Sequence, residues 1–143
     1  TDYNVLLNKN SVPVAVHIQT DDSWTEEQIH LLDNMIYCCL YSTLIDLGVR
    51  ESDLSHHKND FYVKDKKFSC GEHIFENGIF TQNVIITLQM SPEKDLFDRL
   101  TGQYAHRKTI TGIAEEVPSI TKEAFIERLI ERLNLFIEEH FNN

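Results

Sequence analysis

A strand-turn-strand segment over residues 59–71 constrains the fold of this chain more than any other stretch. Phe61, Tyr62 and Val63 bring the aromatic and β-branched side chains that favour a strand. Asp65 lies between lysines, where its short polar side chain favours a tight turn. The second arm carries Lys67 just before a Phe-Ser-Cys-Gly bend. We therefore predict a β-hairpin that holds a lysine at a strand end, either as a functional cation or as an ordinary solvated edge.

Two strand-like runs and a helix precede this hairpin. Residues 3–8 and 12–18 are predicted to form a first β-hairpin. Ser23 or Thr25 opens a capping-box pattern, which predicts a helix that ends near Gly48. The apolar residues of this helix recur at spacings of three or four, which predicts one buried face: Ile29, Leu32, Ile36, Leu40, Leu44 and Leu47.

Alternating strand patterns continue after the central hairpin. Asn77-Gly78 is the strongest two-residue hairpin signal in the chain. The apolar run 83–90 predicts a central strand that is covered on both faces. Strands joined as hairpins, with helices inserted between them, favour an α+β domain: a mixed, largely antiparallel sheet with helices packed on it.

The C-terminal third is predicted to be helical. A short helix is expected over 91–100 and a brief helical turn over 109–117. Thr121 or Ser119 caps a last helix, whose predicted buried stripe contains Phe125, Leu129, Leu133, Phe136 and Ile137. No interdomain linker is evident, so we expect residues 1–143 to form a single domain.

Composition excludes several functional classes. The net charge is −10, with 13 Lys and Arg scattered among 23 acidic residues, so the chain lacks the basic surface that a nucleic-acid binder needs. Its apolar runs are too short to cross a bilayer, and its start does not have the layout of a signal peptide. We therefore expect neither a nucleic-acid partner nor a membrane association.

The cysteines and histidines do not form a recognisable framework. Three cysteines, an odd number, favour a reducing compartment, the cytoplasm or an organellar matrix, over secretion. Cys38 and Cys39 are expected to pack within the first helix. His56, His57 and His73 do not complete a zinc-ligand spacing, so we predict no transition-metal site.

Four segments, in one order, resemble motifs of the lipoate-protein ligase and lipoyl/octanoyl transferase family. Asn59-Asp60 with Lys67-Phe68-Ser69 is similar to its Arg-Asn-Asp strand and its Lys-Ile/Val-Ser-Gly turn. Residues 82–86, 106–111 and 117–123 resemble its His-Gly-Thr-Leu-Leu, Arg-Ser-Arg-Val-Thr-Asn and Leu-Pro-Gly-Ile-Thr-x-Glu segments. The resemblance runs from residue 59 onward and implies a divergent C-terminal part of the catalytic domain, on the biotinyl/lipoyl-ligase fold.

This resemblance implies that the chain binds a lipoyl- or octanoyl-type acyl group, or transfers it to a lysine of a lipoyl-type carrier protein, using ATP and Mg²⁺. Lys67 would be the catalytic residue that steadies the acyl carboxylate, and Asn59 and Asp60 would bind the nucleotide phosphate or its magnesium. The acyl or nucleotide pocket would be bordered by Ser69, Gly71, Asn83, Val84 and Ile85. Cys70 invites a thioester mechanism like that of the octanoyl transferases, but a structural role is favoured because activation of a thiol needs a nearby base or cation.

The family's glycine-rich Arg-Arg-x-Ser-Gly-Gly-Gly stretch would precede residues 3–8, and this chain begins at Thr1. Two alternatives follow. Either an upstream part of a longer protein supplies these adenylate-binding groups, or the chain is a catalytically inactive scaffold on the same fold that binds a protein partner or a small ligand. Enzymatic activity, as an ATP-dependent acyl ligase or acyltransferase, belongs to the first alternative only.

Overall fold

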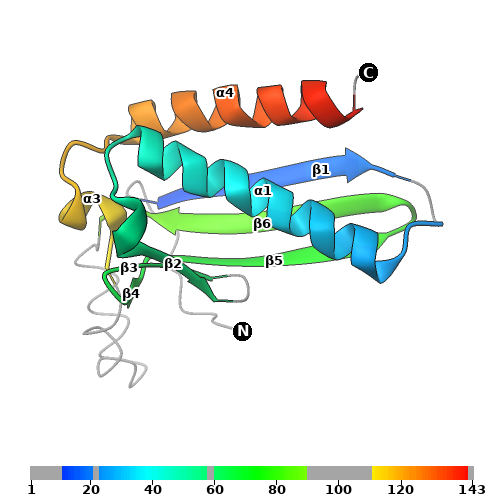
Figure 1. Cartoon of the computed structure of the whole chain (residues 1–143), viewed down its shortest axis with the longest axis horizontal. Helices are drawn as coiled ribbons and strands as arrows, with labels where there is room; N and C mark the ends of the chain where they lie inside the picture. Colours follow the sequence, from blue (N-terminus) through cyan, green and yellow to red (C-terminus); the bar gives the residue numbers. More distant parts are fainter. Residues whose placement is uncertain (1–10, 21–22, 58–59, 90–110, 142–143) are drawn as a thin grey trace.

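The computed structural model describes residues 11–20, 23–57, 60–89 and 111–141. They form an α+β fold in which two long helices pack along a three-stranded sheet, with a smaller sheet beside it (Figure 1). Both sheets are antiparallel throughout their described pairs, so the predicted fold class is confirmed. The sequence had suggested a single sheet. In the described residues, the strands are divided between two sheets.

The larger sheet has the strand order β1-β6-β5 and the smaller sheet the order β2-β3-β4. The larger contains β1 (Ser11–Gln19), β5 (Ser69–Glu76) and β6 (Ile79–Thr87), and the smaller contains β2 (Leu54–His57), β3 (Asp60–Val63) and β4 (Lys66–Lys67). The described helices are α1 (Glu26–Asp46), α3 (Ile113–Glu116) and α4 (Lys122–Phe141), with a 3₁₀ turn at Glu51–Asp53.

Local turn chemistry produces both predicted hairpins. Lys64 and Asp65 have φ values of +49° and +65° between β3 and β4. Asn77 and Gly78 have φ values of +54° and +74° between β5 and β6. Two successive positive φ angles are the signature of the tight turn whose twist suits a two-residue hairpin. The hairpin around residues 59–71 is therefore confirmed in its described part, which begins at Asp60.

Strand β6 is central in the larger sheet, as predicted for the apolar run, but its boundaries and burial differ from the prediction. It spans Ile79–Thr87, and its side chains alternate between buried and more exposed positions. The predicted cover on both faces is therefore only partial: one face of β6 is buried and the other is half-buried. Period-two alternation is the pattern of a strand with one packed face, and the apolar residues at 83–87 had obscured it.

Both long helices begin at side-chain caps. The Thr25 hydroxyl accepts a hydrogen bond from the Gln28 N–H at 3.2 Å, and Gln28 Oε1 accepts one from the Thr25 N–H at 2.8 Å, which completes the predicted capping box. The Thr121 hydroxyl accepts from the Ala124 N–H at 3.1 Å, so Thr121 rather than Ser119 caps α4. Gly48 follows α1 with φ +104°, the left-handed conformation that glycine tolerates best.

The core lies between the two helices and one face of the larger sheet (Figure 1). Alternate residues of β1 and β6, such as Val12 and Ile86, are in register on this face. Residues of α1 and α4, such as Leu44 and Phe125, bury completely against the same cluster. Burial of this kind contributes about 25 cal/mol per Å² of apolar surface, which makes it the main force that holds the helices to the sheet.

Several predictions concern residues outside the described ranges. These are the first strand over 3–8, the helix over 91–100, Asn59, and most of the segment 106–111. The second arm of the first predicted hairpin is described as β1, and its described partner is β6.

Ion pairs join the end of α1 to the middle of α4. Asp46, at the end of α1, accepts hydrogen bonds from Arg128 Nε at 2.7 Å and from Arg132 Nε and Nη2 at 2.7 and 2.8 Å. Partial desolvation raises the pKa of Asp46, but the hydrogen bonds from Arg132 and Arg128 outweigh it and hold the pKa below its ordinary value.

We expect Asp46→Asn to cause a small fall in Tm at pH 7, because a partly exposed ion pair stabilises only weakly. A carboxylate whose pKa is lowered by folding contributes stability above its unfolded pKa, and this contribution is lost as the pH falls through the folded pKa. The difference in Tm between wild type and variant should therefore become progressively smaller as the pH falls below about 4. Thermal melts at several pH values measure it, with Glu127→Gln on exposed α4 surface as the charge-matched control. A difference that does not shrink at all between pH 5 and pH 2 would show that the ion pair is not its cause.

Candidate functional site

The segment that carries Lys67 is fixed by three backbone hydrogen bonds. The Thr111 N–H donates to the Lys67 carbonyl at 2.9 Å, and the Thr87 N–H donates to the Phe68 carbonyl at 2.8 Å. The Phe68 N–H donates to the Phe61 carbonyl at 3.0 Å, and the Phe68 side chain is buried. These bonds tie β4 to β3, to the end of β6 and to the segment before α3. Lys67 is therefore displayed from a rigid support rather than from a loop tip.

The Lys67 side chain pairs with Asp60 across the hairpin. Lys67 Nζ lies 3.1 Å from Asp60 Oδ2, and the two side chains are 19% and 28% exposed. Lys67 is in register with Tyr62, and Asp60 lies two residues from Tyr62 along β3, so all three share one face of the small sheet. The arrangement is a half-buried ammonium group with the Asp60 carboxylate beside it, and this pair brings two of the predicted site residues together.

The neighbouring lysines of the same turn behave differently. Lys66 Nζ lies 3.4 Å and Lys64 Nζ 3.7 Å from the carboxylate of Glu116 in α3, and both lysines are mostly exposed. Since Lys66 is in register with Val63, its side chain leaves the opposite face of the hairpin from Lys67. Lys66 is therefore a natural control for the charge of Lys67.

A buried phenol lies behind this hairpin. Tyr37 of α1 is 2% exposed, and its ring packs edge-on against Phe61 at 5.3 Å. Burial raises the pKa of Tyr37 above its ordinary value, and the carboxylates of Asp33 and Asp60 act in the same direction, so the phenol stays neutral. A Cβ added at Gly71 would lie 2.7 Å from the Tyr37 hydroxyl and 3.0 Å from the Asn83 carbonyl. Gly71 is thus required by the approach of α1 to β5.

The predicted pocket residues divide between the two faces of the larger sheet. Gly71 is in register with Val84, which is buried, and both lie on the face that the helices cover. Asn83 and Ile85 lie on the other face, where they are half-buried. The side chains of the five proposed pocket residues therefore do not line one surface. Of these side chains, those of Asn83 and Ile85 on the face opposite the helices remain accessible to a ligand, together with backbone atoms.

Ser69 and the cysteines have distinct environments. Ser69 is buried, and its hydroxyl accepts a hydrogen bond from the Phe61 N–H at 3.0 Å, so it supports the hairpin. Cys70 is half-buried and lies on the same face as Ile85. Cys39 is half-buried, and its pKa is raised by burial and then by neighbouring Cys38. Cys38 is exposed, so the prediction that it packs in the interior is wrong; it borders a hollow that Arg132 and Leu135 of α4 also line.

Two histidines considered as metal ligands make other contacts. The His56 ring lies 4.9 Å from the ring of Tyr37, and His73 Nδ1 lies 3.2 Å from Asp33 Oδ1. Within the described ranges, no three His, Cys, Asp or Glu side chains gather closely enough to hold a metal ion. In the same residues, no helix is long and apolar enough to cross a membrane.

Sequence reasoning missed the polar residues on the buried side of α1. Asp33 and Gln82 are 3% and 1% exposed, and Gln82 Nε2 donates to Asp33 Oδ1 at 2.8 Å. A signal was present: Asp33 follows Ile29 by four residues and precedes Tyr37 by four, so it stands on the apolar face of the helix. A carboxylate at such a position needs a buried partner, and Gln82 interrupts the apolar face of β6 to supply it.

No protein-family model matches this chain, and no curated protein matches it. Solved structures do. P. falciparum LipL1, solved in complex with lipoate, is similar with a TM-score of 0.66 and 18% identity over 94% of this chain and 34% of LipL1. The bi-partite lipoate protein ligase of Thermoplasma acidophilum, described with its E2 lipoyl domain, gives a TM-score of 0.67 and 14% identity over 92% of this chain and 51% of that chain.

A third similar structure is lipoate-protein ligase A bound with ATP, with a TM-score of 0.66 and 13% identity over 91% of this chain and 51% of the ligase. This chain thus spans about a third to a half of the length of these proteins. The resemblance drawn from the sequence motifs is confirmed at the level of the fold: the chain has a lipoate-protein-ligase-like domain.

Proposed function

We propose that this domain binds a lipoyl- or octanoyl-type acyl group by its carboxyl end and, together with the rest of its protein, transfers that group to a lysine of a lipoyl-type carrier protein. The observation that carries the proposal is the half-buried Lys67–Asp60 pair on a rigid hairpin. The fold of this domain is similar to that of three kinds of ligase structure: one in complex with lipoate, one bound with ATP, and one described together with its E2 lipoyl domain. The three cysteines, which form no disulfide among the described residues, suit a reducing compartment, the cytoplasm or an organellar matrix.

The chemistry of the pair suits a carboxylate ligand. Acyl activation and transfer move negative charge onto and off the carboxyl oxygens, and a fixed cation stabilises that charge best when water is partly excluded. The Lys67 side chain is 19% exposed, its backbone is fixed, and its ammonium group is already paired with Asp60. The ammonium group therefore loses little conformational entropy when it binds a ligand carboxylate. Asp60 keeps Lys67 charged and oriented until a ligand carboxylate competes for it.

The residues present fit part of an ATP and magnesium site. Asp60 offers the oxygen ligand that Mg²⁺ prefers, and Lys67 offers a cation toward phosphate. Asn59, the other residue assigned to this role, lies outside the described residues. When bound, ATP would supply the activating group for the acyl carboxylate, with pyrophosphate as the leaving group. In this chain Lys67 would hold the carboxylate oxygens, and Asp60 would hold the phosphate side through bound Mg²⁺.

A direct assay tests the proposal. The full-length protein is incubated with ATP, Mg²⁺, octanoate or lipoate, and a lipoyl domain, and the lipoyl domain is then weighed as an intact protein. We expect a mass gain of one acyl group, which is absent when ATP is omitted and when the acceptor lysine of the lipoyl domain is replaced. Octanoate binding is followed in parallel by calorimetry. Loss of both signals would contradict the proposal.

The second candidate is a non-catalytic scaffold on the same fold. It is favoured by the sheet face opposite the helices, where Ile74 and Ile79 are 44% and 46% exposed although they lie on adjacent paired strands. An exposed apolar area of this kind suits a protein or a small ligand. Octanoate binding without any mass gain on the lipoyl domain, even with the full-length protein, would favour this function over the ligase.

A further inference from the structure

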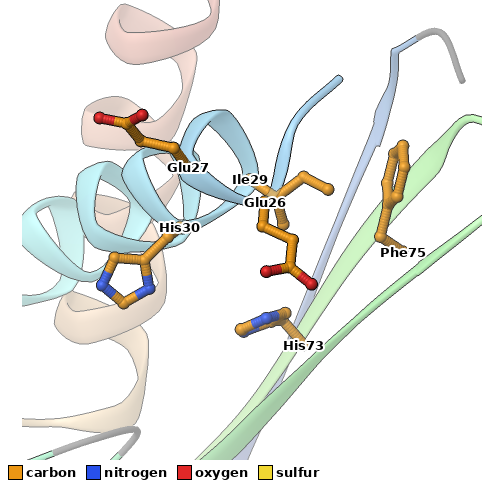
Figure 2. A pocket seen from close by; sticks show the side chains of 6 residues that line it. All are labelled: Glu26, Glu27, Ile29, His30, His73 and Phe75. Atoms are coloured by element: carbon orange, nitrogen blue, oxygen red, sulfur yellow. The ribbon is translucent and has the colours of Figure 1, made fainter. Parts of the chain in front are cut away.

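A hollow lies between the first turns of α1 and strand β5. It has a volume of about 700 Å³ and is lined by Glu26, Glu27, Ile29, His30, His73 and Phe75 (Figure 2). We call it the α1–β5 groove. Lys67 is not among its described lining residues, and Lys67 belongs to β4 of the smaller sheet whereas His73 belongs to β5 of the larger one. The groove is therefore distinct from the site proposed for the acyl group.

His73 is held from behind by a buried polar pair. Its Nδ1 is buried and lies 3.2 Å from Asp33 Oδ1, at an angle that does not form a hydrogen bond, so this nitrogen has no hydrogen-bond partner. Asp33 is itself 3% exposed and accepts from Gln82 Nε2 at 2.8 Å. A carboxylate beside Nδ1 favours the tautomer that carries its proton there. The other ring nitrogen, Nε2, is then a hydrogen-bond acceptor on the groove side.

The polar groups of the groove are thus mostly acceptors with negative charge. Glu26 directs its carboxylate toward the His73 ring, and His30 lies beside them on the same helix (Figure 2). With neutral histidines, the described lining residues carry two negative charges, and none of them is a lysine or an arginine. A ligand that matches it must be a cation with several hydrogen-bond donors.

The spacing of these acceptors favours an organic cation over a metal ion. Among the described residues, no three possible ligand side chains converge on one point, as a metal ion requires. A guanidinium group has five donors spread over a plane and can serve separated acceptors, and it also stacks on flat rings such as His73. Ile29 and Phe75 supply an apolar wall against which the alkyl stem of an arginine can lie.

We propose that the α1–β5 groove binds an arginine side chain of a partner protein. Strand β5 lies at the end of the described order β1-β6-β5, so the groove opens beside a sheet edge along which an extended partner segment can run. A guanidinium group that donates hydrogen bonds to His73 Nε2 and to the Glu26 carboxylate would also reorient the His73 ring. His73 Nδ1 could then form a hydrogen bond with Asp33. This site acts independently of the acyl chemistry at Lys67.

NMR titration of the full chain with N-acetyl-arginine methylamide tests the proposal. N-acetyl-citrulline methylamide, which has nearly the same shape without the charge, is the matched ligand control. We expect the arginine amide to shift the signals of His73, His30 and Glu26, and the citrulline amide to leave them unchanged. Glu26→Gln should weaken the binding by about three- to fivefold, as for a partly exposed charge pair. Glu72→Gln, on an exposed position of the opposite face of β5, should not change it.

Three results would overturn the proposal. The first is equal binding of the citrulline amide, and the second is equal weakening by Glu26→Gln and Glu72→Gln. The third is Zn²⁺ binding to His30 and His73 at micromolar concentration without any response to the arginine amide, which would assign the groove to a metal ion instead. Because Glu26 is exposed, its variant is expected to remain folded, and its backbone spectrum verifies this.

Discussion

Replacing Lys67 with methionine is expected to weaken the binding of octanoate and lipoate by about tenfold to a hundredfold. This range corresponds to the loss of one charge-assisted hydrogen bond to a carboxylate, about 1.5–3 kcal/mol. Methionine keeps much of the length and apolar surface of lysine, so the hairpin should stay folded. Asp60, which lies 3.1 Å from Lys67 Nζ, would then stand unpaired and would repel the ligand carboxylate, which adds to the loss.

Lys66→Met is the matched control because it removes the same charge from the adjacent residue of the same strand. Lys66 faces Glu116 instead of Asp60, so its loss should change octanoate binding by less than about twofold. If the wild-type protein also acylates a lipoyl domain, Lys67→Met should lower that rate by about 10²–10³, as for other groups that stabilise developing charge. Equal effects of the two substitutions in calorimetry would remove Lys67 from the proposed site.

The features that the sequence predicted correctly depend on local chemistry. Asn77-Gly78 tolerates two positive φ angles, and a hydroxyl three residues before Gln28 completes a capping box whatever surrounds it. The partnership of Lys67 with Asp60 is also nearly local, since a hairpin whose turn is set by Lys64 and Asp65 places these strands side by side.

What the sequence did not reveal depends on contacts between distant segments. The helices cover one face of β6, and this decides whether Val84 or Ile85 can contact a ligand. Because Val84 and Ile85 are both apolar, their residue types do not reveal which of the two faces the helices. The role of Gly71 depends on a phenol that arrives from α1, more than thirty residues earlier in the chain. Asp33 on an apolar helix face did indicate a buried partner, but only the fold identifies that partner as Gln82.

Gly112→Ala is expected to cost about 3 kcal/mol of unfolding free energy, because the added methyl group meets backbone atoms. A Cβ at residue 112 would overlap the carbonyl oxygen of Leu88 and lie 2.6 Å from Gln89 Cα. Both are backbone atoms, which cannot move aside as a flexible side chain can. The close approach exists because the Ala114 N–H donates to the Leu88 carbonyl at 2.9 Å, which docks α3 directly on the end of β6.

Gly48→Ala is the comparison, because a Cβ there meets no atom within 4 Å and only the φ of +104° opposes it. Its cost should be about 1–2 kcal/mol, from backbone strain alone. Urea denaturation of the two variants measures both costs. Residue 112 also follows Thr111, whose N–H holds the Lys67 carbonyl, so a displaced α3 should loosen the hairpin and weaken octanoate binding, whereas Gly48→Ala should not. A Gly112→Ala protein that is as stable as Gly48→Ala would show that α3 can leave β6 at little cost, and Lys67 would then lack the rigid support on which its role as a carboxylate clamp depends.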